Sequence, residues 1–299
     1  MLKTLSVIAR KNSDVPLVNG LKPVLLASET YTNETPDGSS APPVLVIHGL
    51  FGTKTNWTYI GRKLANKTKP QRSIIVTDAR NHGSSPHSDE HSYAHMCADW
   101  NYLMNLNNIE KVAVMGHSMG GRCAMYFSLT QPERVDKVII LDVSPANHSK
   151  KSEFSQIKFL LEKMNEVKMP KNVSKSEARE DIDRQLAVDV PQQKLRQFLL
   201  TNLDDRDDGS YSWRVNLPVL IKNFYHNIRT FPNVQGKLFD GPVLFLLGAK
   251  SDFVRPKDHT LINKLFPKVQ IITVEKSGHW LHAEKPNKVI KHCVDFLNG

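Results

Sequence analysis

The chain has 299 residues, of which 40% are apolar and 23% charged, a globular composition that excludes an intrinsically disordered chain. Its formal net charge is +10, but the lysines are spread along the whole chain, so we expect no nucleic-acid partner. No apolar run approaches the roughly 20 residues of a membrane-spanning helix. The three cysteines are widely spaced, which argues against a disulfide framework or a zinc ribbon.

The first residues are basic and carry no acidic side chain before Asp14. Lys3, Arg10 and Lys11 supply the positive charge, and apolar residues lie between them. Over residues 1–20 this composition is typical of a mitochondrial targeting segment, and equally of an ordinary basic N-terminus. Mitochondrial localisation is therefore one expectation, and cytoplasmic localisation is its alternative.

Short apolar runs alternate with helical stretches along most of the chain. Nearly continuous apolar runs are typical of strands that are buried on both faces. Their alternation with helices predicts an α/β fold, with a mostly parallel central sheet flanked by helices. The predicted strands are Val24–Ala27, Val44–Ile47, Ile74–Thr77, Val112–Met115, Val138–Leu141, Val243–Leu247 and Ile271–Val274. The predicted helices are Asn56–Lys67, His91–Asn105, Met119–Thr130, Lys257–Leu265 and Asn287–Leu297.

One long stretch, residues 149–238, breaks this alternation. It is rich in Lys, Glu, Asp and Gln and shows no convincing strand. Insertions of this length in a compact domain usually carry function or form a lid. We predict a helical cap over 149–238, inserted into a core formed by residues 21–148 and 239–299. Its helical patterns are Phe154–Val167, Ser176–Ala187, Gln192–Leu203 and Leu217–Thr230, and aromatic residues such as Phe224 are expected to pack within the cap.

The segment GHSMG places Ser118 between Gly116 and Gly120, in the pattern G-x-S-x-G. A predicted strand precedes it and a predicted helix follows, which is the context of a nucleophilic serine on a sharp strand-to-helix turn. The glycines leave space for that turn, and the start of the helix supplies N–H groups where an oxyanion would form. We predict that Ser118 is the nucleophile. The alternative is a phosphate-binding turn or a simple helix cap.

A serine hydroxyl needs a base to act as a nucleophile. In chains with a G-x-S-x-G turn of this kind, the base is a histidine that follows the last strand. The segment GHWLH offers His279 and His282, and we favour His279 because it lies on the loop that leaves the sheet. A second N–H group for the oxyanion is expected after an earlier strand. The segment HGLFG supplies it, so we assign the amides of Leu50 and Met119 to the oxyanion hole.

Metal ligands are not expected. His87, His91 and His95 are four residues apart, but Ser92 stands where the zinc motif H-E-x-x-H requires glutamate. The acidic run Asp204–Gly209 lacks the remainder of a calcium loop and is interpreted as a solvated turn.

Taken together, HGLFG, DARNHGSSPHS, GHSMGG and GHWLHAEKP resemble the α/β-hydrolase superfamily, and within it a group that includes bacterial esterases, from about Pro43 to Leu297. The resemblance implies an α/β-hydrolase fold with a cap. It also implies a Ser-His-Asp triad that needs no cofactor and no metal. The motifs are much more specific for fold and family than for substrate.

The acid of the triad is less clear from the sequence. Many α/β-hydrolases place it in a pattern G-x-x-D-x-x-V after the penultimate strand, but here the position three after Gly248 is Ser251. Asp252 lies one residue further. Asp142 ends the strand before the insertion, where catalytic groups gather in open α/β sheets, and the bacterial relatives take their acid from that strand. We favour Asp142 and keep Asp252 as the alternative acid.

These features predict a serine hydrolase that cleaves carboxylic esters or thioesters through an acyl-enzyme, in the manner of an esterase or lipase. The expected substrate is a small-molecule or lipid acyl ester. One alternative is a C–C bond hydrolase or a perhydrolase with the same triad. Another is a non-catalytic binding protein on a hydrolase scaffold.

Overall fold

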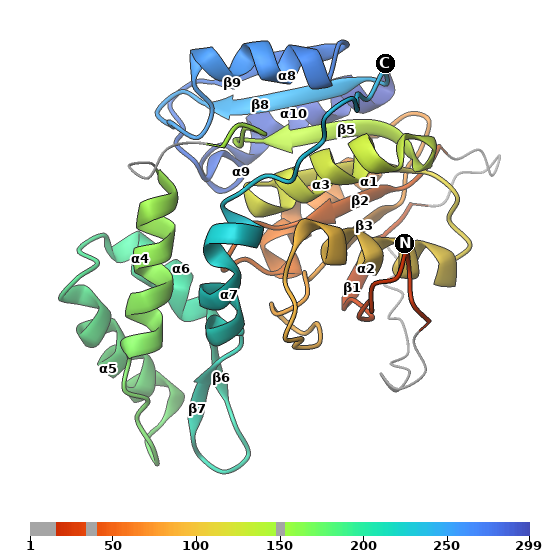
Figure 1. The fold of residues 1–299 in the computed structure, drawn as a ribbon. Helices are drawn as coiled ribbons and strands as arrows, with labels where there is room; N and C mark the ends of the chain where they lie inside the picture. The colour runs from red at the N-terminus through yellow and green to blue at the C-terminus, as the bar shows by residue number, and fades with distance from the viewer. Residues whose placement is uncertain (1–15, 34–40, 148–152) are drawn as a thin grey trace.

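The computed structural model describes residues 16–33, 41–147 and 153–299. Its main sheet has seven strands in the order β1-β3-β2-β4-β5-β8-β9, and every pairing is parallel except that of β1 with β3. The predicted α/β class with a mostly parallel sheet is confirmed (Figure 1). The strands are β1 (Ser28–Tyr31), β2 (Val44–Ile47), β3 (Ile74–Thr77), β4 (Val112–His117), β5 (Val135–Leu141), β8 (Val243–Gly248) and β9 (Val269–Val274).

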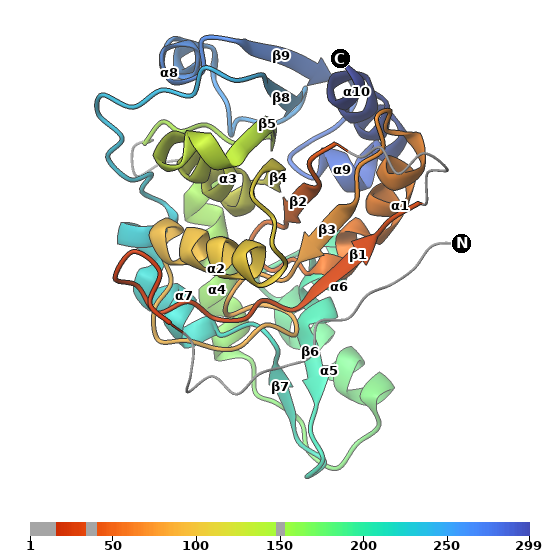
Figure 2. The ribbon, with the colours of Figure 1, turned by 90° about the vertical axis from the view of Figure 1, so that its right-hand side faces the viewer.

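Helices cover both faces of this sheet, with α2, α3 and α8 on one side and α1, α9 and α10 on the other (Figure 2). Successive side chains of a strand point to opposite faces. In β2, Leu45 and Ile47 therefore pack in one apolar cluster, and Val44 and Val46 pack in the other. The helices are α1 (Thr58–Lys67), α2 (Tyr93–Leu106), α3 (Met119–Thr130), α8 (His259–Leu265), α9 (Leu281–Glu284) and α10 (Pro286–Asn298).

The first predicted strand was wrong in position. Val24–Ala27 is apolar, and its Val24 and Leu26 side chains are buried, but its backbone is not part of a strand. The N–H of Val24 donates to a carboxylate oxygen of Asp99 at 2.7 Å, and the N–H of Ala27 donates to the Ser85 hydroxyl at 2.9 Å. Because side chains take these two donors, the strand begins only at Ser28, although the carbonyl oxygen of Ala27 already accepts from the N–H of Asp78 at 2.9 Å.

Residues between β5 and β8 form a lobe beside the sheet, at the side where β5 ends (Figure 1). The lobe is mostly helical, as predicted. The prediction that it contains no strand was wrong, because a small antiparallel hairpin lies within it. Its strands have only three residues each, too short to show an alternating pattern. The elements of the lobe are α4 (Glu153–Glu166), α5 (Lys175–Ala187), α6 (Gln193–Leu199), β6 (Leu203–Asp205), β7 (Tyr211–Trp213), α7 (Leu217–Asn223) and a π-helix (Phe224–Ile228).

Most of the candidate targeting segment, residues 1–15 of 1–20, lies outside the described residues, so mitochondrial localisation stays a prediction. Across the described ranges, none of the helices combines the length and the apolar character needed to cross a membrane.

Candidate active site

Ser118 stands between the end of β4 and the start of α3, with φ 54° and ψ −118°. This conformation is costly for a non-glycine residue and persists only where the surroundings enforce it. The two flanking glycines permit the tight approach of the chain. A Cβ on Gly116 would lie 2.2 Å from the carbonyl oxygen of Gly120, and a Cβ on Gly120 would lie 2.5 Å from that of Ile47. The sequence therefore folds into the strained turn that the G-x-S-x-G pattern predicts.

Asp142 and His279 form a hydrogen-bonded pair, with 2.7 Å between the carboxylate Oδ2 and the imidazole Nδ1. Asp142 follows β5 and is 1% exposed, and His279 lies on the loop after β9. Two further donors hold the carboxylate: the N–H of Gly248, 2.8 Å from Oδ1, and the Ser251 hydroxyl, which donates to Oδ2. Three donors on one buried carboxylate fix its orientation.

Asp252, the alternative acid, lies apart from this pair. Its side chain is exposed. In the described part of the chain, no hydrogen bond joins it to His279. Ser251 stands at the sequence position that the G-x-x-D-x-x-V pattern would give to an acid, and its hydroxyl donates to Asp142 instead. In the sequence, Ser251 marks only the place where an acid is missing, and its neighbours do not indicate this second role.

His279 rather than His282 meets the carboxylate. His282 is buried in α9 and stacks on Trp57, with 4.9 Å between ring centroids and 4° between planes. Burial lowers the pKa of His282 to about 3, so it stays neutral. His117, the residue before Ser118, supports the His279 loop: its Nε2 hydrogen-bonds the His279 carbonyl oxygen at 2.8 Å, and the two rings lie 4.5 Å apart. This contact brings the serine turn and the His279 loop together.

A small, nearly filled pocket lies at Ser118, with a cavity volume of about 10 Å³. Its walls are mainly apolar and come from both the core and the lobe. They are formed by Leu50, Tyr93, Ser118, Met119, Ile157, Phe224 and Ile228. Phe224, expected to serve only packing within the cap, therefore also faces the pocket. The Ser118 hydroxyl forms no hydrogen bond with His279 among the described residues, as is common in hydrolases without bound substrate.

The two residues assigned to the oxyanion hole, Leu50 and Met119, both line this pocket. The N–H of Met119 opens α3 and has no carbonyl of a preceding turn to bind. Leu50 follows a tight turn in which the N–H of Gly52 donates to the carbonyl oxygen of Gly49 at 3.0 Å. Its own N–H has no hydrogen-bond partner in the described ranges. Leu50 and Met119 thus both lie at the pocket that contains Ser118.

Arg122, one turn after Ser118 on α3, connects the core to both ends of the lobe. Its fully buried guanidinium donates to the carbonyl oxygens of Ser144 and Ala146, at 3.0 and 2.8 Å, and to that of Arg229. The Tyr93 hydroxyl donates to the carbonyl oxygen of Ile228 at 2.5 Å. These bonds fix the π-helix that supplies two pocket walls. Neither role is visible in the sequence, because a buried arginine or tyrosine is recognised only by its partners.

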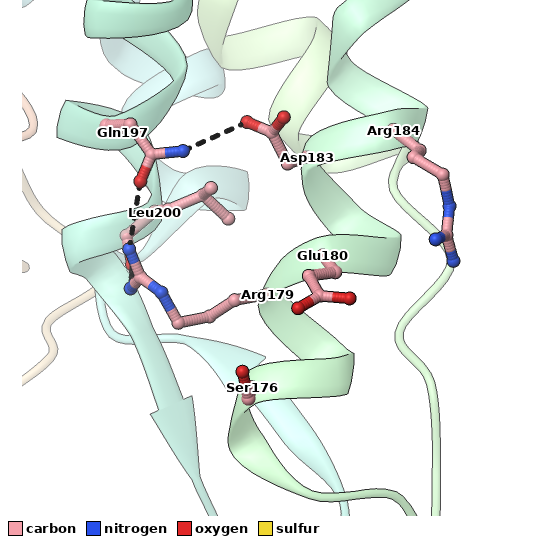
Figure 3. A pocket seen from close by; sticks show the side chains of 7 residues that line it. All are labelled: Ser176, Arg179, Glu180, Asp183, Arg184, Gln197 and Leu200. Carbon is pink, nitrogen blue, oxygen red and sulfur yellow. Dashed lines mark hydrogen bonds between the residues drawn. The ribbon is translucent and has the colours of Figure 1, made fainter.

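A polar hollow between α5 and α6 does not belong to this site (Figure 3). Its side chains bind one another: Arg179 donates to Gln197 Oε1 and Gln197 Nε2 donates to Asp183 Oδ1, each at 3.3 Å. Elsewhere, the regions that the structure describes contain no group of three or more His, Cys, Asp and Glu arranged to hold a metal ion.

Comparison with known proteins identifies the class. A family model described as the alpha/beta hydrolase fold matches residues 42–286, and the chain belongs to this family. The resemblance found in the four sequence motifs is thereby confirmed.

Individual relatives indicate which kind of α/β hydrolase this chain is. The chain is 39% identical over 262 residues to the sn-1-specific diacylglycerol lipase ABHD11 of Mus musculus, covering 87% of this chain and 83% of the mouse protein. It is 30% identical over 262 residues to esterase YbfF of Escherichia coli K12, covering 86% and 93%. A solved structure, a marine microorganism esterase, matches with a TM-score of 0.81 and 32% identity, covering 91% and 99%. The chain is thus an esterase- or lipase-like α/β hydrolase.

Replacing Ser251 by alanine is expected to lower kcat/KM for a short ester about tenfold, because the Asp142 carboxylate loses one charge-assisted hydrogen bond. Ser251→Thr keeps the hydroxyl and should retain most activity. The measurement is kcat/KM on p-nitrophenyl butyrate for both variants. Equal losses in the two would contradict a role for the hydroxyl.

Proposed function

We propose that this chain is a serine hydrolase of carboxylic esters, acting through a Ser118–His279–Asp142 triad. The observation that carries the proposal is the hydrogen bond of 2.7 Å between the buried Asp142 carboxylate and His279. The loop that bears His279 is itself held next to the strained Ser118 turn by the hydrogen bond from His117. Relatives named as a lipase and as esterases support the same reaction class.

In the proposed mechanism, the Ser118 oxygen attacks the ester carbonyl carbon as its proton passes to His279 Nε2. Asp142 accepts from Nδ1–H, keeps that tautomer and stabilises the imidazolium. The Leu50 and Met119 amides donate to the oxyanion, each worth about 3 kcal/mol of transition-state stabilisation. The proton then moves to the leaving alkoxide, the alcohol departs, and water attacks the acyl-enzyme with His279 as base. Apart from the substrate and the attacking water, the groups that act in these steps are side chains and backbone of this chain.

The pocket suggests which part of the substrate binds where. Apart from Tyr93 and Ser118 its walls are hydrocarbon or thioether, and the Tyr93 hydroxyl is already bound to Ile228. We therefore assign the pocket to the acyl chain of the ester, and propose lipid acyl esters, such as acylglycerols, as the substrate class. A thioester could be attacked by the same groups and is the second substrate to assay.

A fluorophosphonate probe tests this proposal directly, because it reacts with an activated serine. The purified chain is treated with the probe, and the adduct is located by peptide mass spectrometry. We expect a single adduct on Ser118, and prior heat denaturation should abolish it. Folded protein without label on Ser118 would contradict the hydrolase proposal and favour a non-catalytic binder. Labelled protein that cleaves a vinylogous diketone but no ester would favour a C–C bond hydrolase.

The size of the pocket gives a prediction about acyl length. Its cavity volume of about 10 Å³ is far below the usual range for ligand pockets, and Ile157 on α4 forms one wall. Ile157→Ala is expected to raise the kcat/KM ratio of p-nitrophenyl octanoate to butyrate at least about fivefold, since each buried methylene contributes appreciable discrimination. Phe159→Ala, on the same helix but 38% exposed, is the matched control and should leave the ratio unchanged. A ratio that changes equally in both variants would contradict the acyl assignment.

A further inference from the structure

Phe253 stacks face to face on His279. The ring centroids are 3.6 Å apart and the planes are inclined by 13°. Phe253 is 6% exposed and lies on the loop after β8, the same loop that sends the Ser251 hydroxyl to Asp142. The backbone N–H of Phe253 donates to the Ser251 hydroxyl oxygen at 3.3 Å, so the two side chains are positioned together.

This geometry is unusual for two neutral aromatic rings. Neutral rings prefer offset or edge-to-face packing, with centroids about 4.5–7 Å apart, because their electron-rich faces repel. A cation above an aromatic face is instead attracted by the ring quadrupole. A close, nearly parallel stack on an imidazole is therefore more favourable when the imidazole is protonated than when it is neutral.

We propose that Phe253 is a positioning residue that acts through His279, stabilising the imidazolium formed when the Ser118 proton is transferred. This inference rests on the proposed function. In that step the Ser118 O–H bond breaks as the bond from oxygen to the carbonyl carbon forms, and the proton goes to His279 Nε2. The positive charge exists in the transition states and tetrahedral intermediates but not in the resting base. The stack therefore favours the transition state over the ground state, which is what accelerates a reaction.

Few of the groups around His279 could stabilise its imidazolium form. Asp142 faces Nδ1 and favours the same cation. His117 and His282 are the other titratable side chains nearby, and burial lowers the pKa of both, so neither carries a competing positive charge. Trp280 meets the His279 ring at 69° with centroids 5.5 Å apart, an angle that does not present its face in the same way. Phe253 is thus the aromatic face that lies parallel to the imidazole.

Stepwise fluorination of the Phe253 ring tests the proposal, because it weakens the negative face while changing the shape little. 4-Fluoro- and 3,4,5-trifluorophenylalanine are incorporated at position 253 of the full chain. The acid limb of the kcat/KM profile for p-nitrophenyl butyrate reports protonation of the free base. We expect the limb to move to lower pH with each step, by about 0.5 to 1 unit for the trifluoro ring, the effect of losing an ordinary cation–π contact. kcat/KM on the alkaline side should fall severalfold.

Phe266 is the matched control. It is fully buried in the core against Phe245, with centroids 6.0 Å apart, and belongs to no part of the site. The same fluorinated residues at position 266 should leave the acid limb in place. Phe253→Leu, which keeps the site apolar without an aromatic face, should resemble the trifluoro variant.

A second readout separates this inference from the proposed function. NMR titration of the His279 imidazole gives its protonation midpoint without any turnover. A midpoint that falls with fluorination at position 253, and not at 266, supports the stack. A midpoint and an acid limb that stay fixed in the trifluoro variant would overturn it, even if fluorophosphonate labels Ser118. If Ser118 does not label, the midpoint still tests the stack, and the proposed function fails alone.

Discussion

Ser118→Ala is expected to lower kcat for p-nitrophenyl butyrate by about 10⁶, the scale of loss when the nucleophile of a triad is removed. The reason is that no acyl-enzyme can form, and water has no activated attacking group in its place. Binding of the acyl chain should change little, since the pocket keeps its apolar walls. The measurements are kcat and KM, together with the pre-steady-state burst of p-nitrophenolate, which should disappear.

Ser128→Ala provides the matched control on the same helix. Ser128 is also buried, and its hydroxyl donates to the carbonyl oxygen of Met125 at 2.9 Å, away from the pocket. This variant should keep its burst and at least most of its kcat. If Ser118→Ala retained a burst of normal amplitude, the acyl-enzyme would form on another residue and the proposed nucleophile would be wrong.

The central sheet was predictable because the signal for each of its strands lies within the residues of that strand. A strand buried on both faces must be apolar at every position, and Val44–Ile47 and Ile74–Thr77 show that pattern within their own residues. The same criterion failed at Val24–Ala27. Those residues are apolar for packing, yet their N–H groups bind Asp99 and Ser85, more than 50 positions away in the chain. Hydrogen bonds between distant residues leave no periodic signal in a sequence.

The serine turn was predictable for a related reason. The crowding at Gly116 and Gly120 allows almost no other residue, so the requirement of the backbone is visible in the residue types themselves. Roles that depend on a neighbour are not visible in this way. Phe253 reads as one more apolar residue, and only its stack on His279 gives it a function.

The pocket walls illustrate a third limit. Phe224 and Ile228 are four residues apart and would share a face of an α-helix, yet they belong to a π-helix that Arg122 and Tyr93 fasten to the core. A π-helix has wider turns than an α-helix, and its register depends on what binds its carbonyl groups. The shape of the acyl pocket therefore follows from contacts between lobe and core, which composition and periodicity do not encode.

Asp142→Asn is expected to lower kcat by about 10⁴, and Asp252→Asn to leave it within about twofold. The geometry gives the reason. The N–H of Gly248 donates to Oδ1 of Asp142 and would keep the amide oxygen of asparagine at that position. The amide NH₂ would then face His279 Nδ1 and donate to it, which places the imidazole proton on Nε2. In that tautomer His279 cannot accept the Ser118 proton.

The two variants are matched, because each removes one charge with almost no change in volume, and only one lies against the imidazole. Steady-state kinetics on p-nitrophenyl butyrate and the rate of fluorophosphonate labelling should fall together in Asp142→Asn, with an unchanged circular dichroism spectrum. A loss of about 10⁴ in Asp252→Asn with an active Asp142→Asn would assign the acid to Asp252. That result would require the loop after β8 to turn Asp252 inward when substrate binds, and with it Ser251 and Phe253 away from the positions that hold Asp142 and His279 at rest.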